Sequence, residues 1–147
     1  ALPSQIAIMT AAVADWRTTV SAQEKIKKNT DNTPPSLELT ENPDILAGLV
    51  AHTLRPDLIV GFAAETEQVM DHARAKFTRK GCDWLIANNV SPDTGVMGGD
   101  FNTIHFLTQT SEESWEMLSK QDVALRLADR IADYFLETHK LEKQEAR

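Results

Sequence analysis

The chain has 147 residues, of which 41% are hydrophobic and 25% charged, so it is long enough to fold as one domain around a buried core. Its 15 Lys and Arg residues against 22 Asp and Glu residues give a net charge of −7, which argues against nucleic acid or an anionic membrane surface as its main partner. The sequence has no apolar run of about 18 residues, which argues against a membrane-spanning helix. The single cysteine, Cys82, excludes an internal disulfide framework and fits a cytoplasmic protein.

The first predicted element is a strand over residues 6–9, an apolar run that small residues follow. Residues 17–36 are polar, end in two prolines and predict a long loop, a kind of segment that is often functional. Residues 37–40 alternate between apolar and polar side chains and predict a short strand.

A helix is predicted to begin at Asn42-Pro43-Asp44. Asn42 can cap free backbone N–H groups, Pro43 suits the first helical position, and Asp44 favours the positive end of the helix dipole. The helix ends before Pro56. A continuous apolar run over residues 58–63 then predicts a strand that is covered on both faces, as in a parallel sheet.

The second half of the chain continues the alternation of helices and strands. A helix over residues 67–80 is stopped by Gly81, and a strand is predicted over residues 83–87. Residues 88–100 hold three glycines and one proline and predict a loop.

The last third predicts an antiparallel pair and a final helix. Residues 103–107 form a strand, and residues 115–118 are its expected antiparallel partner. Ser119 is expected to cap a helix that reaches about His139, with Asp122 completing a capping box. The remaining residues, 140–147, form a polar tail.

Strands that alternate with helices predict an α/β fold, here a three-layer, Rossmann-like, mostly parallel sheet with an antiparallel extension. Ligands of such sheets bind beyond the carboxyl ends of the strands. The segments after Met9, Phe62 and Ala87 are therefore expected to share the edge of the sheet where a ligand binds.

The positive charge of the chain is concentrated in two windows. Residues 15–28 and residues 67–80 each carry a net charge of +2, which leaves −11 for the rest of the chain. Such islands are typical either of solvated surfaces or of a site for a small polyanion. Charge alone favours the first interpretation and leaves the second open.

Three lysines, Lys25, Lys27 and Lys28, lie on the predicted long loop. A mobile loop with clustered ammonium groups can close over phosphates and screen a reaction from water, but it can equally serve solubility. Asp15 follows the first strand, where a carboxylate holds a metal ion or a ligand, or simply shapes a turn.

Lys76 and Lys80 fall within the apolar stripe of the helix over residues 67–80, one turn apart. Like charges at that spacing repel mildly, so a shared anionic ligand explains their placement better than two lysines that snorkel to solvent. Phe62 ends a buried strand and suits either the core or stacking on a base. The glycine-rich patterns GxGxxG and GxxxxGK[ST] are both absent.

Taken in order, these segments resemble a known family, phosphopantothenate–cysteine ligase of coenzyme A biosynthesis. The resemblance spans about residues 6–134 and is carried by AAVADW, EKIKK, ENPDILAGL, IVGFAAET, ARAKFTRKGCDWLIANNVS and GGDFN. In many bacteria this ligase is the C-terminal half of a multifunctional enzyme whose upstream decarboxylase domain uses FMN.

The resemblance implies a reaction in two steps. The carboxylate of 4′-phosphopantothenate attacks the α-phosphate of CTP, which gives an acyl-cytidylate and pyrophosphate, and the amine of L-cysteine then displaces CMP. The resemblance also implies Mg²⁺ or Mn²⁺, and a homodimer that forms through the sheet extension near residues 102–118.

The resemblance also implies roles for particular residues. Lys25 is the catalytic lysine of the mobile loop, and Asp15 is the expected metal ligand. The nucleotide pocket is expected to comprise Met9, Thr10, Ala11, Asp15, Lys25, Pro43, Asp44, Ile45, Leu46, Phe62, Lys76 and Lys80.

The family's glycine-rich phosphate-binding segment, which precedes AAVAD, is not among the 147 residues. Residues 1–139 are therefore expected to match the C-terminal two-thirds of a ligase domain, and these residues alone are expected to bind nucleotide weakly and to ligate poorly. The alternative is a non-catalytic nucleotide- or NAD-binding α/β module, which predicts no preference for CTP and no effect of changing Lys25.

Overall fold

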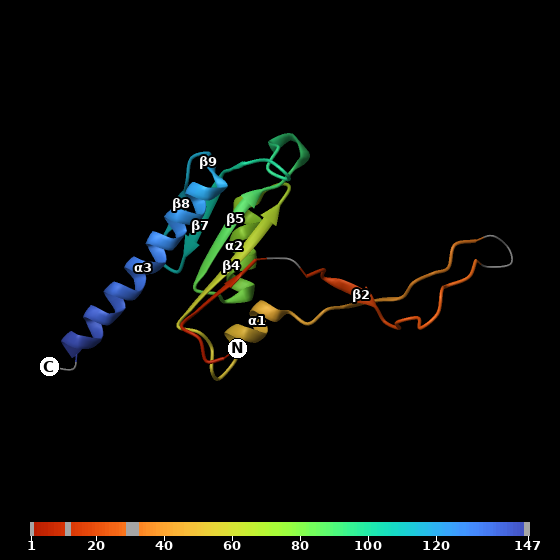
Figure 1. Ribbon diagram of the computed structural model, residues 1–147, viewed down its shortest axis with the longest axis horizontal. Coiled ribbons are helices and arrows are strands. Elements are labelled where there is room, and N and C mark those ends of the chain that lie inside the picture. Colours follow the sequence, from red (N-terminus) through yellow and green to blue (C-terminus); the bar gives the residue numbers. More distant parts are fainter. Residues whose placement is uncertain (1, 11–12, 29–32, 146–147) are drawn as a thin grey trace.

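A computed structural model describes residues 2–10, 13–28 and 33–145. Its centre is a sheet of five strands in the order β1-β4-β5-β7-β8 (Figure 1). The first three strands in this order pair in parallel, and the last two join antiparallel. The strands are β1 (Ile6–Met9), β4 (Leu58–Glu65), β5 (Trp84–Asn89), β7 (Ile104–Thr108) and β8 (Glu112–Ser114). The predicted mostly parallel sheet with an antiparallel extension is confirmed.

Helices cover both faces of this sheet, so the predicted three layers are confirmed as well. Side chains alternate between the faces of a strand, and each face therefore packs against different helices. Val60, Ile86 and Phe106 belong to the core cluster under α3 (Lys120–Glu145). Their neighbours on the opposite face pack against α1 (Ile45–Val50) and α2 (Val69–Lys80) and include Ile59, Leu85 and Leu107.

Strand β4 allows α1 to pack close to the sheet because it carries Gly61. A Cβ atom on Gly61 would lie 2.9 Å from the Cδ2 atom of Leu46 in α1, a distance that real Cβ contacts essentially never show. Leu58, Ile59, Val60 and Ala63 are fully buried, as the sequence predicted, whereas Phe62 is half-buried and Ala64 is exposed.

The antiparallel part differs from the prediction. The partner of β7 is residues 112–114 rather than 115–118, because a tight turn in which the Thr108 N–H donates to the Ser111 carbonyl at 2.8 Å brings the chain back at once. Trp115 is buried in the core cluster under α3 instead. Residues 118–119 form β9 (Leu118–Ser119), which pairs with β6 (Phe101–Asn102).

The final helix begins as predicted and ends later. The Oγ atom of Ser119 accepts from the N–H of Asp122 at 3.0 Å, which is the expected cap. The helix continues to Glu145 instead of ending near residue 139, because the Glu, Lys, Leu and Gln residues there are good helix formers. Among the described residues, no helix is apolar over enough of its length to cross a bilayer.

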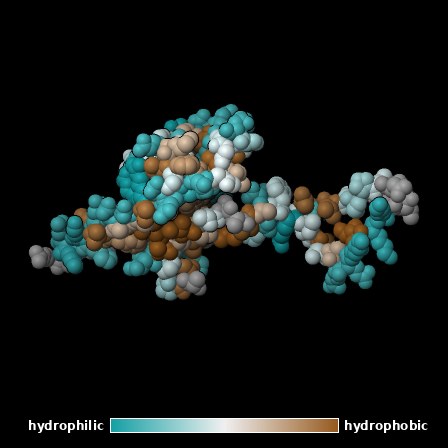
Figure 2. Space-filling view, turned by 45° about the horizontal axis from the view of Figure 1, so that its top comes forward, coloured by the Kyte–Doolittle hydropathy of each residue, from teal (hydrophilic) through white to brown (hydrophobic). Residues whose placement is uncertain are grey.

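The segment predicted as a long loop contains a second, small sheet. β2 (Trp16–Thr18) pairs antiparallel with β3 (Leu39–Glu41), and together with residues 19–28 and 33–38 they form an arm that projects from the body (Figure 1). The prediction missed β2 and placed β3 two residues early. Figure 2 shows hydrophobic side chains on this arm, where Val20, Ile26, Leu37 and Leu39 are exposed.

Residues 92–94, in the predicted loop before β6, form a single 3-10 turn, η1 (Pro92–Thr94).

The start of α1 is set by Asp44 rather than by Asn42. Asp44 is the N-cap, and its Oδ1 atom accepts from the Ala47 N–H at 3.0 Å, while its Oδ2 atom accepts from the Nζ atom of Lys80. Partial burial alone would raise the pKa of the Asp44 carboxyl, but the hydrogen bonds from Lys80 and Ala47 outweigh it and lower the pKa. One carboxylate therefore caps α1 and ties it to α2.

Replacing Trp115 with Ala is expected to lower the free energy of unfolding by about 3–5 kcal/mol, because the ring is 2% exposed, stacks on Phe106 at 5.6 Å and lies under the Arg126 guanidinium at 4.4 Å. Urea unfolding of Met117→Ala is the matched control. Met117 lies two residues away and is 68% exposed, so its loss is expected to change stability by about 0.5 kcal/mol or less. Equal losses in the two variants would contradict this packing.

Replacing Asp44 with Asn is expected to lower stability at pH 7 by about 0.5 kcal/mol, the size of an exposed ion pair, since Asn keeps the cap but loses the charge. The folded-state pKa of Asp44 lies below its ordinary value of 3.8, so its contribution is present above that value and is lost as the pH falls through the folded-state pKa. The measurement is the denaturation midpoint of both proteins against pH. A difference that stays constant down to pH 2 would contradict the assignment.

Candidate functional site

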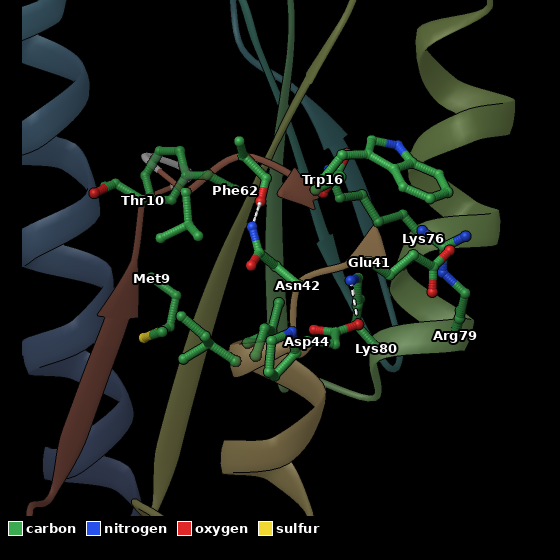
Figure 3. A pocket seen from close by; sticks show the side chains of 16 residues that line it. Met9, Thr10, Trp16, Glu41, Asn42, Asp44, Phe62, Lys76, Arg79 and Lys80 are labelled. Carbon is green, nitrogen blue, oxygen red and sulfur yellow. Dashed lines mark hydrogen bonds and ion pairs between the residues drawn. The ribbon is translucent and has the colours of Figure 1, made fainter. Parts of the chain in front are cut away.

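A pocket of about 580 Å³ lies beyond the carboxyl end of β1 and beside Phe62, which lies within β4 and does not end it as predicted, because the strand continues to Glu65. Its walls come from the end of β1, Phe62, the base of the arm, the start of α1 and the C-terminal half of α2 (Figure 3). Of the three segments expected at the ligand-binding edge, the one after Met9 lines this pocket, whereas the residues directly after Phe62 and after Ala87 do not. Parallel pairing of β1 with β4 brings Met9 beside Gly61, so the residues that follow β1 lie next to Phe62.

Most of the predicted site residues line this one pocket. They are Met9, Thr10, Asp15, Pro43, Asp44, Ile45, Leu46, Phe62, Lys76 and Lys80. Ala11 lies outside the described residues. Lys25 does not line the pocket; it is exposed, on the outer part of the arm.

The pocket is also lined by four polar or aromatic residues that the sequence analysis did not assign to the site, namely Trp16, Glu41, Asn42 and Arg79. Trp16 faces Glu41 across the small sheet, a pairing between residues far apart in the sequence that no local pattern signals. Arg79 did carry a signal, because it precedes Lys80 in the basic segment ARAKFTRK.

Asn42 joins the arm to the body at the floor of the pocket. Its side-chain amide donates to the Ala14 carbonyl at 2.7 Å, and its backbone N–H donates to the Asp15 carbonyl at 2.8 Å. Asn42 therefore acts as a tether between two strand ends, not as a helix cap. These two bonds fix the position of Asp15 relative to the start of α1.

Three cations project from α2 toward the pocket, Lys76, Arg79 and Lys80 (Figure 3). The side chains of Lys76 and Lys80 are only 25% and 18% exposed, so these two lysines of the positive window are not fully solvated, whereas Arg74 and Arg79 are exposed. Lys80 pairs with Asp44, and the Nζ atom of Lys76 lies 3.8 Å from an oxygen of Glu65. Arg79 forms no ion pair with the described residues.

The pocket is balanced in charge, because three carboxylates line it beside the three cations. They belong to Asp15, Glu41 and Asp44. A polyanion that enters can pair with Arg79 directly, and for further partners it either displaces a carboxylate from its lysine or brings a cation with it. Both outcomes suit a nucleotide, whose phosphates commonly bind together with Mg²⁺.

No three His, Cys, Asp or Glu side chains in the described part of the chain come together as a metal site. Mg²⁺ bound with a nucleotide usually takes one or two carboxylates, and phosphates complete its coordination. Asp15, a single carboxylate on the pocket wall, fits that donor set and does not fit a site built from protein groups alone.

Cys82 is a core residue, as the sequence favoured. It is fully buried, and burial raises the pKa of its thiol, so it does not supply a thiolate nucleophile. The segment GGDFN lies elsewhere: Gly99, Asp100, Phe101 and Asn102 line a second pocket of about 640 Å³, near the end of β5.

Comparison with known proteins supports a family assignment. The sequence profile of the DNA/pantothenate metabolism flavoprotein C-terminal domain matches residues 1–135. The coenzyme A biosynthesis bifunctional protein CoaBC of Vibrio cholerae is 39% identical over 120 residues, which are 82% of this chain and 30% of that protein. The CoaBC protein of Escherichia coli is 37% identical over 131 residues, 88% of this chain and 32% of that protein. The chain thus spans about a third of the length of these relatives.

Solved structures share the fold. The C-terminal domain of a CoaBC protein superimposes with a TM-score of 0.65 at 24% identity, over 92% of this chain and 57% of that chain. A DNA/pantothenate metabolism flavoprotein from Streptococcus pneumoniae gives a TM-score of 0.69 at 18% identity, over 90% of this chain and 64% of that chain. A Cab2 variant in complex with phosphopantothenate-cysteine gives 0.56 at 15% identity, over 80% of this chain and 40% of that chain.

At these identities the solved structures establish the common fold alone, whereas the profile covers nearly the whole chain. The chain belongs to the DNA/pantothenate metabolism flavoprotein C-terminal domain family.

Proposed function

We propose that the full-length protein containing this chain joins 4′-phosphopantothenate to L-cysteine in a CTP-dependent reaction, as part of coenzyme A synthesis. The observation that carries the proposal is the convergence of Lys76 and Lys80 on one pocket beyond the carboxyl end of β1. The names of the relatives support it, since CoaBC proteins are bifunctional enzymes of coenzyme A biosynthesis.

In the first step, a carboxylate oxygen of 4′-phosphopantothenate attacks the α-phosphorus of CTP, and pyrophosphate leaves with the electrons of the broken P–O bond. Negative charge grows on the phosphate oxygens. Lys76, Arg79 and Lys80 are placed to stabilise that charge from one side of the pocket. Asp15 would hold Mg²⁺ against the phosphates, and the ion would supply further neutralising charge.

Recognition of the base falls to the apolar side of the pocket. Phe62 and Trp16 both line it and offer aromatic faces on which a pyrimidine ring can stack. Pro43, Ile45 and Leu46 line the pocket with them and help to exclude water from the base.

In the second step, the cysteine amine attacks the acyl carbon, the amide forms and CMP leaves with the phosphate oxygen. Water competes with the amine for the acyl-cytidylate, so the pocket must be covered during this step. Lys25 lies outside the pocket on the exposed arm, and the proposal requires the arm to close and bring its ammonium group to the reacting carbonyl.

The homodimer belongs to the proposal too. Residues 102–118 contain the antiparallel extension, and Phe101 and Met117, which flank it, are exposed apolar side chains that a second copy would cover.

We likewise propose that the protein works in the cytoplasm, where the substrates of coenzyme A synthesis are found.

The full-length protein is expected to release pyrophosphate from CTP with a kcat/KM at least about tenfold higher than from ATP, because the proposal assigns recognition of a pyrimidine base to the apolar side of the pocket. The assay requires 4′-phosphopantothenate and cysteine, and leaving out either substrate is the control. Equal use of CTP and ATP, or binding without turnover, would favour the non-catalytic nucleotide- or NAD-binding module instead.

Replacing Lys25 with Gln is expected to lower the rate of product formation by about 10²-fold or more, the usual cost of losing one charge-stabilising group. Lys27→Gln removes the same charge from the same segment, and it is expected to keep most of the activity. Mass spectrometry of the amide product measures both variants. Equal rates in the two variants would count against a catalytic role for Lys25.

A further inference from the structure

Glu65 lies at the carboxyl end of β4, between the sheet and α2, and it does not line the pocket. Its backbone is fixed by the neighbouring strand, because it pairs with Asn89 and its carbonyl accepts from the Val90 N–H at 2.8 Å. Its side chain is 21% exposed. A carboxylate this well covered on a rigid strand end has few positions available to it.

The carboxylate contacts a lysine and a histidine of α2, one with each oxygen. The Oε1 atom lies 3.8 Å from the Nζ atom of Lys76, and the Oε2 atom lies 3.6 Å from the Nδ1 atom of His72. His72 and Lys76 are one helical turn apart and therefore share the face of α2 that meets Glu65. Of these three residues, only Lys76 also lines the pocket.

The contact of Lys76 with Glu65 is longer than a hydrogen bond, so it is an ion pair that restrains the ammonium group without locking it in place. Lys80, one turn further along α2, is held more tightly, because its ammonium group donates a hydrogen bond to Asp44. Each pocket lysine thus has its own carboxylate, supplied by a different element. Without its carboxylate the flexible stem of Lys76 would be free to turn away from the pocket.

We infer that Glu65 is a positioning residue for Lys76: its carboxylate holds the lysine ammonium at the pocket wall until a phosphate oxygen of the nucleotide takes its place. The exchange of Glu65 for a phosphate oxygen rests on the proposed function, whereas the contact that holds Lys76 at the pocket wall concerns the protein without ligand. Glu65 touches no substrate and acts only through Lys76.

The first test measures Lys76 directly, in the full-length protein without nucleotide. Acetic anhydride modifies a lysine amine faster when that amine is more exposed to solvent, and the Lys76 side chain is only 25% exposed while Glu65 holds it. Glu65→Gln is expected to raise the acetylation rate of Lys76 at least about threefold relative to Lys80 in the same molecule, as measured by mass spectrometry, because the released side chain can turn toward solvent. An unchanged ratio would overturn the inference.

Glu67→Gln is the matched control. It removes the same charge two residues further along the chain, and the side chain of Glu67 is exposed and forms no ion pair with the described residues. It is expected to leave the acetylation of Lys76 unchanged. Glu65→Asp keeps the charge on a shorter stem and is expected to give an intermediate rate. If Glu65→Gln does not fold, Glu65→Asp is tested in its place. The inference is then overturned if Lys76 is acetylated at the same rate in Glu65→Asp as in the wild-type protein.

The second test separates positioning from a merely structural role through kinetics. Glu65→Gln is expected to lower the KM for CTP about threefold, because the phosphates no longer compete with a carboxylate, and to leave kcat within about twofold, because a phosphate oxygen holds Lys76 in the nucleotide complex of both proteins. Glu67→Gln is expected to change neither value. If the two variants shift KM and kcat alike, Glu65 has no special role.

The two tests also separate this inference from the proposed function. If the wild-type protein turns over neither CTP nor ATP, the proposed ligase activity is wrong, and the acetylation ratio still decides whether Glu65 holds Lys76. If turnover is normal and the ratio does not respond to Glu65→Gln, the ligase stands and the role of Glu65 is refuted.

Discussion

The close approach of α1 to β4 is the constraint on which the pocket depends. Gly61 makes it possible, since a Cβ atom there would force the Leu46 side chain to shift. Packed at that distance, α1 presents its capping residue Asp44 to Lys80 on α2, and the two helices are joined. The pocket is the space enclosed by these helices, the end of β1, Phe62 of β4, and the base of the arm.

The electrostatics of the pocket follow from that arrangement. Carboxylates from the strand, the arm base and α1 stand next to cations that all come from α2. Without ligand the protein satisfies its own lysines, which keeps a cluster of like charges on one helix from destabilising it. A bound triphosphate would replace the carboxylates as the partners of these lysines. The affinity for nucleotide is therefore the difference in free energy between the lysine–phosphate pairs that form and the lysine–carboxylate pairs that break.

The sequence predicted those parts of the molecule that local patterns determine. The buried run of β4, the cap at Ser119 and the shared placement of Lys76 and Lys80 each depend on neighbours within a few residues, and the structure agrees with them. The pairing of β2 with β3 and the tight turn before β8 were missed, because they join residues whose patterns look like loops. Trp16 and Glu41 enter the site only through such pairing, and so no spacing rule reveals them. The contact of Lys76 with Glu65 likewise depends on how α2 crosses β4.

The base of the arm also limits how the sequence of this protein can change in length. Trp16 and Glu41 are cross-strand partners and pocket residues at once, so a one-residue insertion within β2 or β3 would turn a pocket side chain to the other face of the small sheet. None of the described residues in the outer part of the arm lines the pocket, so this restriction on register does not apply to them. Related chains are therefore expected to differ in arm length between Lys25 and Leu39, whereas the segment that carries Lys25 toward the pocket and the few residues that join the arm to the body must keep their count.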